Sequence, residues 1–184
     1  MMQANPPLGI ACLVVLAGPP GSGKSTWARR NGRGAVHVSQ DELIDAITPE
    51  GFEHVYRPIY AAAEEAIART ALQNGQTVVI DRTNRTAAHR RRWIRLARQA
   101  GCPAIAVEMN APQWLCRERN DARQDHRRVS AQRLERMFAA MEAVRPDEGF
   151  AAIYSGDDVT LTGILSDLKS KQEVLLHEHC NQAG

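Results

Sequence analysis

Lysine and cysteine are both scarce in this sequence. Of its 184 residues, three are lysine, at positions 24, 169 and 171, and four are cysteine: Cys12, Cys102, Cys116 and Cys180. The cysteines have no short pairwise spacing, and a disulfide framework would be unusual in a domain of this kind. The lack of a disulfide pattern favours the cytosol, where thiols stay reduced.

Long apolar stretches are also missing, and no segment is long enough to span a bilayer. The run Leu8–Ala17 is almost uncharged, but no lysine or arginine precedes it. It continues directly into a glycine-rich loop that cleavage of a signal peptide would destroy. We therefore expect a cytoplasmic protein with no membrane contact.

The composition is that of an ordinary soluble domain, with 43% hydrophobic and 24% charged residues, and the length suits one α/β domain. The net charge is only +2, but the arginines are concentrated in two blocks. The first block is Arg82, Arg85, Arg90, Arg91, Arg92, Arg95 and Arg98, and the second is Arg117, Arg119, Arg123, Arg127, Arg128, Arg133 and Arg136. Each block fits either a binding surface for nucleic acid or a triphosphate, or a solvated helix face in an arginine-rich chain.

A glycine-rich stretch, residues 18–25, reads Gly-Pro-Pro-Gly-Ser-Gly-Lys-Ser and lies between an apolar run and a helix-compatible segment. Its spacing is that of the phosphate-binding P-loop, in which glycines let backbone N–H groups point at phosphate oxygens. The alternative is an ordinary turn between a strand and a helix. Lys24 would place its charge near the β- and γ-phosphates, and the Ser25 hydroxyl would ligate Mg²⁺. We expect ATP to contact Gly18, Gly21, Ser22, Gly23, Lys24, Ser25 and Thr26.

Apolar strands alternate with helical segments along the chain. Strands are predicted at 10–17, 35–38, 76–80, 104–109 and 150–154, and helices at 24–30, 53–73, 86–99, 131–144 and 161–176, with a further helix opened by Pro112 in which Trp114 and Leu115 are buried. This order predicts an α/β P-loop NTPase fold, with a parallel five-stranded sheet and helices on both faces.

Two aspartates follow strands at the edge where open parallel sheets bind ligands. Asp41 comes just after the second strand, where it is a candidate site residue or, with Ser39, a helix cap. Asp81 ends the third strand, the position from which a carboxylate orients Mg²⁺ in NTPases. The predicted metal ligands are therefore Ser25 and Asp81.

The segment from Arg117 to Arg128 has almost no apolar residues and follows the fourth strand. Nothing in it predicts anchorage to a core. A mobile, arginine-bearing segment at this place suits a lid that closes over the triphosphate and supplies arginine to the transferring phosphoryl group.

Several of these motifs together resemble the kinase domain of polynucleotide 5′-hydroxyl kinases, over roughly residues 10–155. The resemblance rests on Gly21–Arg29, on Ser39-Gln40-Asp41-Glu42, on Asp81-Arg82-Thr83-Asn84 followed by the arginine-rich helix with Trp93, and on Arg119-Asn120 with Arg123. The superfamily also contains zeta-toxin-like and small-molecule P-loop kinases.

The resemblance implies roles for residues of this sequence. Asp41 matches the general base that acts on the acceptor hydroxyl, and Arg123 and Arg119 match lid arginines that contact the donor phosphates. Asp81, Arg82 and Asn84 match the element that lines the substrate site. ATP and Mg²⁺ are the implied cofactors, and a DNA or RNA 5′ end is the implied partner.

One position departs from the family pattern. Polynucleotide kinases usually carry an arginine for the acceptor phosphate three residues after the general base, and here that residue is Ile44. Arg57, Arg82 or Arg85 could take its place. Three hypotheses follow: a polynucleotide 5′-hydroxyl kinase, a kinase for a sugar, nucleoside or antibiotic, and a nucleotide-dependent switch without phosphotransfer.

The chain divides into three predicted parts. Residues 1–9 form a flexible leader, residues 10–156 the P-loop kinase domain, and residues 157–184 a C-terminal helix and tail. The tail carries His177-Glu178-His179-Cys180, to which we assign no site. No aspartate-based phosphatase motif is present, so a combined end-healing enzyme is not expected.

Overall fold

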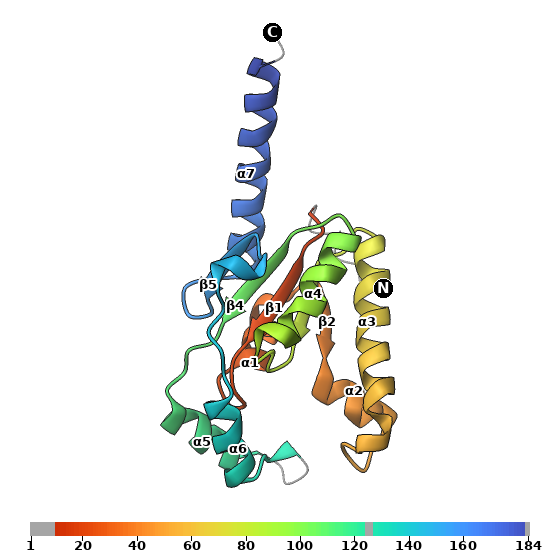
Figure 1. Cartoon of the computed structure of the whole chain (residues 1–184), viewed down its shortest axis with the longest axis vertical. Helices are drawn as coiled ribbons and strands as arrows, with labels where there is room; N and C mark the ends of the chain where they lie inside the picture. The colour runs from red at the N-terminus through yellow and green to blue at the C-terminus, as the bar shows by residue number, and fades with distance from the viewer. Residues whose placement is uncertain (1–9, 124–126, 183–184) are drawn as a thin grey trace, which may run out of the picture.

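The computed structural model describes residues 10–123 and 127–182, with side chains described as far as residue 174, and it centres on a five-stranded sheet. The strands are β1 (Leu13–Ala17), β2 (Val36–Ser39), β3 (Val78–Asp81), β4 (Ala104–Glu108) and β5 (Ala152–Ser155). They lie in the order β2-β3-β1-β4-β5, and every neighbouring pair is parallel (Figure 1). The predicted parallel sheet is confirmed.

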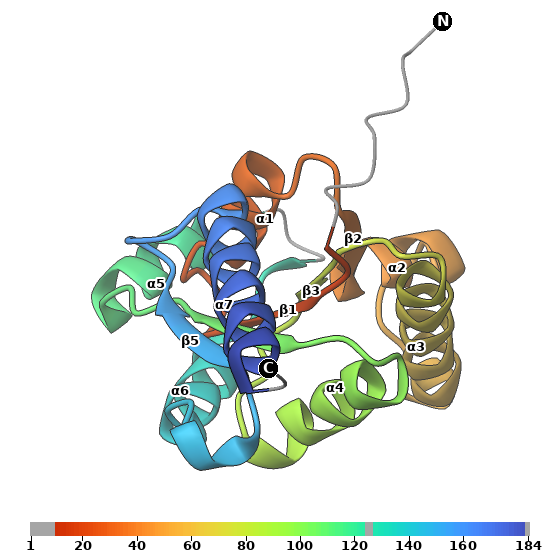
Figure 2. The same cartoon turned by 90° about the horizontal axis from the view of Figure 1, so that it is seen from above.

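Helices connect the strands and lie on both faces of the sheet (Figure 2). They are α1 (Lys24–Asn31), α2 (Gln40–Ile47), α3 (Arg57–Gln73), α4 (Ala87–Gln99), α5 (Gln113–Asp121), α6 (Ala131–Ala139) and α7 (Leu161–Gln182), with 3₁₀ turns η1 (His54–Tyr56) and η3 (Pro146–Glu148). None of the helices in the described ranges is long and apolar enough to cross a membrane.

Alternate side chains of β1 enter two separate cores. Val14 and Leu16 pack against residues of α1 and α7, whereas Leu13 and Val15 pack against residues of α3 and α4. All four side chains are fully buried. Burial of a strand on both faces is typical of a parallel sheet covered by helices, and it explains the unbroken apolar run that precedes the glycine-rich loop.

The α3 helix differs from the sequence prediction in where it starts and in which face is buried. It begins at Arg57, after the turn η1. Pro58 lies in the first turn of the helix, where a backbone N–H has no partner within the helix, so a proline is tolerated there. The buried residues are spaced four apart: Tyr60, Glu64, Ala68 and Leu72. Of the apolar residues whose three- and four-residue spacing predicted this helix, Val55, Ile59 and Ile67 are 71%, 51% and 39% exposed, whereas Ala71 packs against the core.

Two further helices depart from the prediction. Trp114 was expected to be buried but is 64% exposed, because α5 packs on α6 through Cys116 and not through the tryptophan. The α6 helix ends at Ala139 and not near residue 144. The chain leaves the helix there because buried Arg90 binds the carbonyl oxygens of Glu142 and Ala143.

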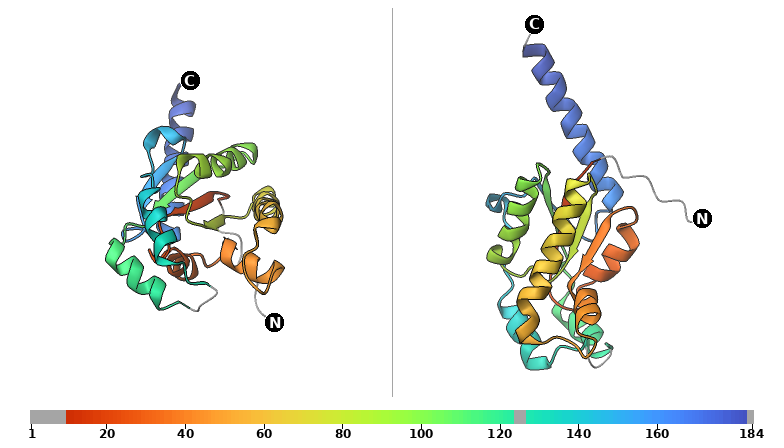
Figure 3. Two further views of the ribbon diagram at one scale, coloured as in Figure 1. Left: turned by 60° about the horizontal axis from the view of Figure 1, so that its bottom comes forward. Right: turned by 90° about the vertical axis from the view of Figure 1, so that its right-hand side faces the viewer.

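The C-terminal helix α7 packs on the sheet by its first turns only. Leu161, Ile164 and Leu165 are buried in the core that also contains Val14 and Leu16. The rest of α7 extends away from the sheet (Figure 3). The residues of the predicted leader, 1–9, and the side chains of the histidine-rich tail lie outside the described residues.

All five strands end at the same edge of the sheet, because they are parallel. In Figure 1 this is the lower edge, where α1 and α2 begin. The hairpin of α5 and α6 lies on one side of this edge, and α2 with the first turns of α3 lies on the other. The candidate residues Lys24, Asp41 and Asp81 all belong to this edge.

Candidate functional site

The glycine-rich loop connects β1 to α1 and packs directly against α5. Gly23 is the N-cap of α1 with φ 99°, a left-handed conformation that favours glycine. A Cβ at Gly21 would lie 2.4 Å from the carbonyl oxygen of Cys116 in α5. Glycine at position 21 therefore lets α5 approach the loop, a packing reason that adds to the predicted access of phosphate.

Lys24 is buried at the start of α1, and its ammonium group binds the loop itself. Its Nζ donates to the carbonyl oxygen of Pro19 at 2.7 Å and to Ser22 Oγ at 3.4 Å. Burial lowers the pKa of Lys24 to about 8, against opposition from the charge of Asp81. The charges of Arg123 and Asp41 also act on this pKa, so both groups lie close to the lysine.

Asp81 is buried at the end of β3, beside basic and hydroxyl groups. Nε2 of His37 in β2 lies 3.3 Å from Asp81 Oδ2, and the Ser25 side chain lies close enough to act on the same carboxylate. Burial alone would raise the pKa of Asp81, but His37, Ser25 and the charge of Lys24 hold it below its usual value. The carboxylate is therefore ionised at neutral pH.

Asp41 lies in the first turn of α2 and is exposed. The cap of this helix is Ser39, whose Oγ accepts a hydrogen bond from the N–H of Glu42 at 3.3 Å. Because Ser39 satisfies the helix terminus, the Asp41 carboxylate remains available to a ligand. Ile44, one turn further along α2, is partly buried.

The lid prediction falls on the connection between α5 and α6, of which residues 124–126 lie outside the described residues. The ends of this connection are anchored, contrary to the sequence prediction. Buried Asn120 donates to the carbonyl oxygen of Val129 at 2.8 Å and accepts from its N–H at 3.0 Å. A small core of Cys116, Leu134 and Phe138 joins α5 to α6.

Three arginines of this hairpin face the rest of the site. Arg119 donates from Nη1 to the carbonyl oxygen of Gly21 at 3.2 Å, so it contacts the phosphate-binding loop. Arg123 is partly buried and lies close enough to Lys24 to lower its pKa. Arg127 pairs with Asp45 of α2, which links the hairpin to the opposite side of the sheet edge.

Two predicted substrate residues are occupied by contacts within the protein. Asn84 is buried with φ 41°, donates to the carbonyl oxygen of Leu16 at 2.7 Å, and accepts from Trp93 Nε1 at 3.0 Å. These bonds fix the turn after β3 and correct the expectation that Asn84 lines the substrate site. Arg82 is paired with buried Glu64 of α3.

Several charged residues with important contacts in the structure had no recognisable motif in the sequence. Arg90 belongs to the first arginine block, but it is fully buried and paired with Glu148, so it is structural. Glu64 stands in a row with Tyr60, Ala68 and Leu72 at four-residue spacing. A carboxylate in such an otherwise apolar row could have indicated a buried charge. The partner of Asp81, His37, had no signal beyond its place in a strand.

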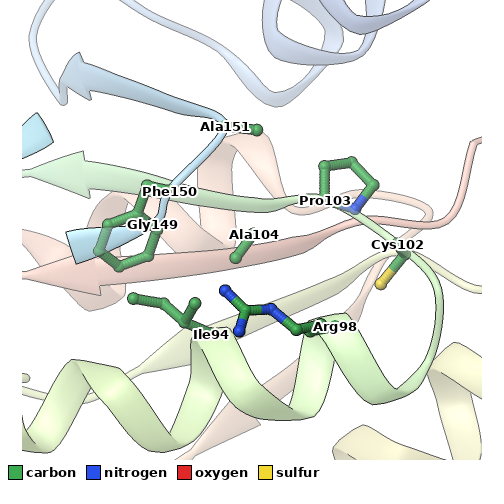
Figure 4. A pocket seen from close by; sticks show the side chains of 8 residues that line it. All are labelled: Ile94, Arg98, Cys102, Pro103, Ala104, Gly149, Phe150 and Ala151. Carbon is green, nitrogen blue, oxygen red and sulfur yellow. The ribbon is translucent and has the colours of Figure 1, made fainter. Parts of the chain in front are cut away.

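A separate pocket of about 260 Å³ lies between α4, the start of β4 and the segment that precedes β5 (Figure 4). Its lining includes Ile94, Arg98, Cys102 and Phe150. Ala104, the first residue of β4, also lines it, so the pocket lies at the opposite end of the strand from the candidate site. Burial raises the pKa of the Cys102 thiol, which disfavours a reactive thiolate.

A comparison with protein families decides the classification. The model of the AAA_33 family, described as an AAA domain, matches residues 13–146. The chain belongs to this family. The matched range contains the glycine-rich loop, Asp41, Asp81 and the arginine-bearing hairpin. Membership of the AAA_33 family confirms the P-loop kinase classification suggested by the sequence.

Relatives and solved structures agree with AAA_33 membership. The chain is 32% identical over 116 residues to the bifunctional polynucleotide phosphatase/kinase of Schizosaccharomyces pombe; the match covers 62% of this chain and 25% of that relative. This chain thus spans about a quarter of the relative's length. The match supports homology to the kinase domain of polynucleotide kinases.

Two solved structures share the fold at low sequence identity. Chaetomium thermophilum Kti12 in complex with ADP-AlF3 superimposes with a TM-score of 0.63 at 18% identity, covering 86% of this chain and 97% of that chain. The Mycobacterium tuberculosis APS kinase CysC in complex with AMPPNP and APS gives a TM-score of 0.62 at 19% identity, covering 91% and 99%. They establish the fold of the AAA_33 chain as that of P-loop kinases.

Proposed function

We propose that this protein transfers the γ-phosphate of ATP to an alcohol, and that the alcohol is the 5′-hydroxyl of a polynucleotide. The observation that carries the proposal is the meeting of four charges at one sheet edge. Lys24, Asp81, Asp41 and Arg123 lie close enough together for the other three to act on the pKa of the lysine. These residues supply the parts that phosphoryl transfer needs. Lys24 is a cation for phosphate, and Asp81 is a carboxylate of the kind that binds a metal ion. Asp41 is an unpaired carboxylate, and Arg123 is a lid arginine.

The residues around Ser25 fit a bound Mg²⁺. The Ser25 side chain lies close enough to Asp81 to lower the pKa of its carboxylate, and both groups supply the oxygen ligands that a hard cation prefers. We assign Ser25 and Asp81 to hold the ion, directly or through water. Mg²⁺ would supply charge neutralisation to the phosphates of ATP.

The proposed step is an in-line displacement in which the chain supplies position and charge. Asp41 accepts the proton of the acceptor hydroxyl as the oxygen of that hydroxyl bonds to the γ-phosphorus. The bond between the γ-phosphorus and its bridging oxygen breaks, and ADP leaves with the electron pair. Lys24, Arg119 and Arg123 stabilise the negative charge on the transferring group, while the loop N–H groups hold the other phosphates.

The loop between α2 and α3 favours a nucleic-acid acceptor. The loop before α3 exposes Phe52 and Tyr56, each 37% exposed, next to the exposed Arg57. Flat aromatic side chains beside cations are what bases and phosphates of a single strand bind. This arrangement, together with the homology to a polynucleotide kinase domain, supports the polynucleotide over a simple sugar.

A small alcohol is the second candidate, and Ile44 is the observation that favours it. Ile44 lies one turn after Asp41 and is partly buried, and its side chain carries no positive charge for an acceptor phosphate. A pocket built around an aliphatic side chain would suit an uncharged acceptor.

Transfer of labelled γ-phosphate from ATP in the presence of Mg²⁺ tests the proposal. The acceptors are a 5′-hydroxyl oligonucleotide, the same oligonucleotide with a 5′-phosphate as a blocked control, and a panel of nucleosides, sugars and aminoglycosides. Label on the 5′-hydroxyl oligonucleotide alone supports the proposal, and label on a small alcohol alone supports the second candidate. ATP hydrolysis without transfer to any acceptor would contradict both and favour a nucleotide-dependent switch.

A further inference from the structure

A buried carboxylate lies among several cations on the α3 and α4 side of the site. Glu64 of α3 is fully buried, and its Oε2 accepts from Arg82 Nη1 at 2.5 Å and from Arg92 Nη2 at 2.6 Å. Both guanidinium groups therefore share one oxygen. The other oxygen, Oε1, is buried and has no hydrogen-bond partner among the described residues.

The two guanidinium groups retain donors for another ligand. Each uses one of its five N–H groups on Glu64, and the side chains of Arg82 and Arg92 remain 25% and 27% exposed. A guanidinium that binds one anion through a single N–H can bind a second through its other edge. The Glu64 carboxylate holds both arginines in place for such contact.

Further basic side chains without partners lie near this pair. The side chains of Arg57, Arg85 and His89 make no hydrogen bond or ion pair with any residue of the described ranges. Burial lowers the pKa of His89, and the charges of Arg85, Arg82, Arg92 and Arg57 lower it further. Four guanidinium groups thus lie near one carboxylate, which leaves an excess of about three positive charges at neutral pH.

The position of these arginines relates them to the acceptor and not to ATP. Arg82 follows Asp81 directly, Arg85 lies in the turn before α4, and Arg57 begins α3 beside the aromatic loop. Apart from Asp81, the residues assigned to the donor belong to the glycine-rich loop or to the hairpin of α5 and α6, and none of these arginines does. Repulsion between positive charges that are partly removed from water lowers the stability of the empty protein. A bound anion reduces this repulsion.

We propose that Arg57, Arg82, Arg85 and Arg92, organised by Glu64, form a binding site for a phosphate group carried by the acceptor. This inference rests on the proposed phosphotransfer and names the substrate class: an alcohol that also bears a phosphate. The site replaces the acceptor-phosphate contact that Ile44 cannot make. Guanidinium groups suit this ligand because their planar donors match two phosphate oxygens at once.

The test compares two acceptors that differ only in a phosphate: a nucleoside 3′-phosphate with a free 5′-hydroxyl, and the nucleoside itself. Binding is measured by calorimetry while a non-hydrolysable ATP analogue saturates the donor site. The variant is Arg57→Gln with Arg85→Gln, because neither side chain has a partner whose loss would disturb the fold. Arg95→Gln, an exposed arginine of α4 without a hydrogen bond or ion pair in the described chain, is the matched control.

The wild type should bind the phosphorylated nucleoside at least about tenfold more tightly than the nucleoside, as charge-assisted hydrogen bonds predict. The double variant should lose this preference, with a rise of about 10- to 100-fold in the dissociation constant of the 3′-phosphate. Arg95→Gln should behave as the wild type. Equal binding of both acceptors by the wild type, or an unchanged preference in the double variant, would overturn the proposal.

The same proteins separate this inference from the proposed function. If the preference is lost in the double variant but no acceptor is phosphorylated by the wild type, the anion site stands and the transfer proposal fails. If phosphate is transferred equally well to both nucleosides by the wild type and by the double variant, transfer stands and the anion site fails. A 5′-hydroxyl oligonucleotide and a phosphorylated sugar, assayed alongside, distinguish a phosphodiester from a small phosphate ester as the source of the anion.

Discussion

The proposed donor side and the proposed acceptor side of the sheet edge are built differently. On the donor side the charged groups are buried and paired: Lys24 binds its own loop, and Asp81 contacts His37. On the acceptor side the side chains of Asp41, Arg57 and Arg85 make no hydrogen bond or ion pair with the residues that the structure describes, and Asp41 and Arg57 are exposed. In the proposed reaction the donor is ATP, for which the site is built in advance, whereas the charged side chains of the acceptor site would find their partners on a particular substrate.

The largest expected effect is on the donor side. Lys24→Ala should abolish ATP turnover, with a loss in kcat of at least about 10²-fold, because the charge that faces the β- and γ-phosphates is gone. Steady-state ATP consumption in the presence of acceptor measures this loss. Lys169→Ala, an exposed lysine of α7, is the control and should keep full turnover. Equal turnover in both variants would remove Lys24 from the site.

The second prediction concerns the arginine that joins the two sides. Arg123→Ala should lower kcat on the order of 10³-fold if the guanidinium stabilises the transferring phosphoryl group as an arginine finger does. Single-turnover phosphate transfer measures the chemical step without product release. Arg133→Ala, an exposed arginine of α6, should leave the rate within about twofold of the wild type. A loss below tenfold for Arg123→Ala would make it a solvated charge.

A third prediction tests whether Glu64 organises the acceptor side. Glu64→Ala should lower the free energy of unfolding by about 3 kcal/mol, because it leaves two partly buried guanidinium groups without their anion. Urea denaturation measures the change. The neighbouring Glu65 forms an exposed pair with Arg69, and Glu65→Ala should cost less than about 1 kcal/mol. Similar losses in both variants would show that the Glu64 pair is no stronger than a surface pair.

The smallest expected effect is a pH dependence on the donor side. The pKa of Lys24 is lowered from 10.5 to about 8 in the folded protein, so between these values the unfolded chain binds more protons. The free energy of unfolding without nucleotide should therefore rise with pH in this window, by at most about 1.4 kcal/mol per pH unit from this group. Lys24→Met should lack that contribution, and at pH 7 it should be more stable than the wild type.

Denaturation at pH 7.5, 8.5 and 9.5 measures this contribution as the difference between the two proteins. The difference cancels the titration of other groups, including Cys12, whose pKa burial raises to about 11. Parallel stability curves would mean that the ammonium group of Lys24 is solvated in the empty loop.

The sequence predicted the donor side well because its signals are local. The glycine-rich loop, the strand that precedes it and the aspartate that ends β3 each occupy a few consecutive residues, and the structure places them where the pattern predicted. The five strands follow from the same kind of short apolar run. Their ends converge because parallel strands share one edge.

The acceptor side was less predictable because its contacts join distant residues. Glu64 pairs with Arg82 and Arg92, which lie 18 and 28 positions away, and Arg90 pairs with Glu148, which lies 58 positions away. One arginine block therefore contains both a structural residue and candidate ligands, and nothing in the local pattern separates them. The same reason explains why the wrong face of α3 looked buried, since the helix carries apolar residues on two faces.

The role of Asp41 is the most direct test of phosphotransfer to a hydroxyl. Asp41→Asn keeps the size of the side chain but removes the proton acceptor, and Glu42→Gln in the same helical turn is the control. ATP affinity, measured by calorimetry, and transfer of labelled γ-phosphate to the accepted substrate are compared for both variants. We expect nearly unchanged ATP binding and a loss of transfer of about 10²- to 10⁴-fold for Asp41→Asn, with Glu42→Gln close to the wild type. Normal transfer by Asp41→Asn would contradict the assignment of the base and the acceptor chemistry built on it.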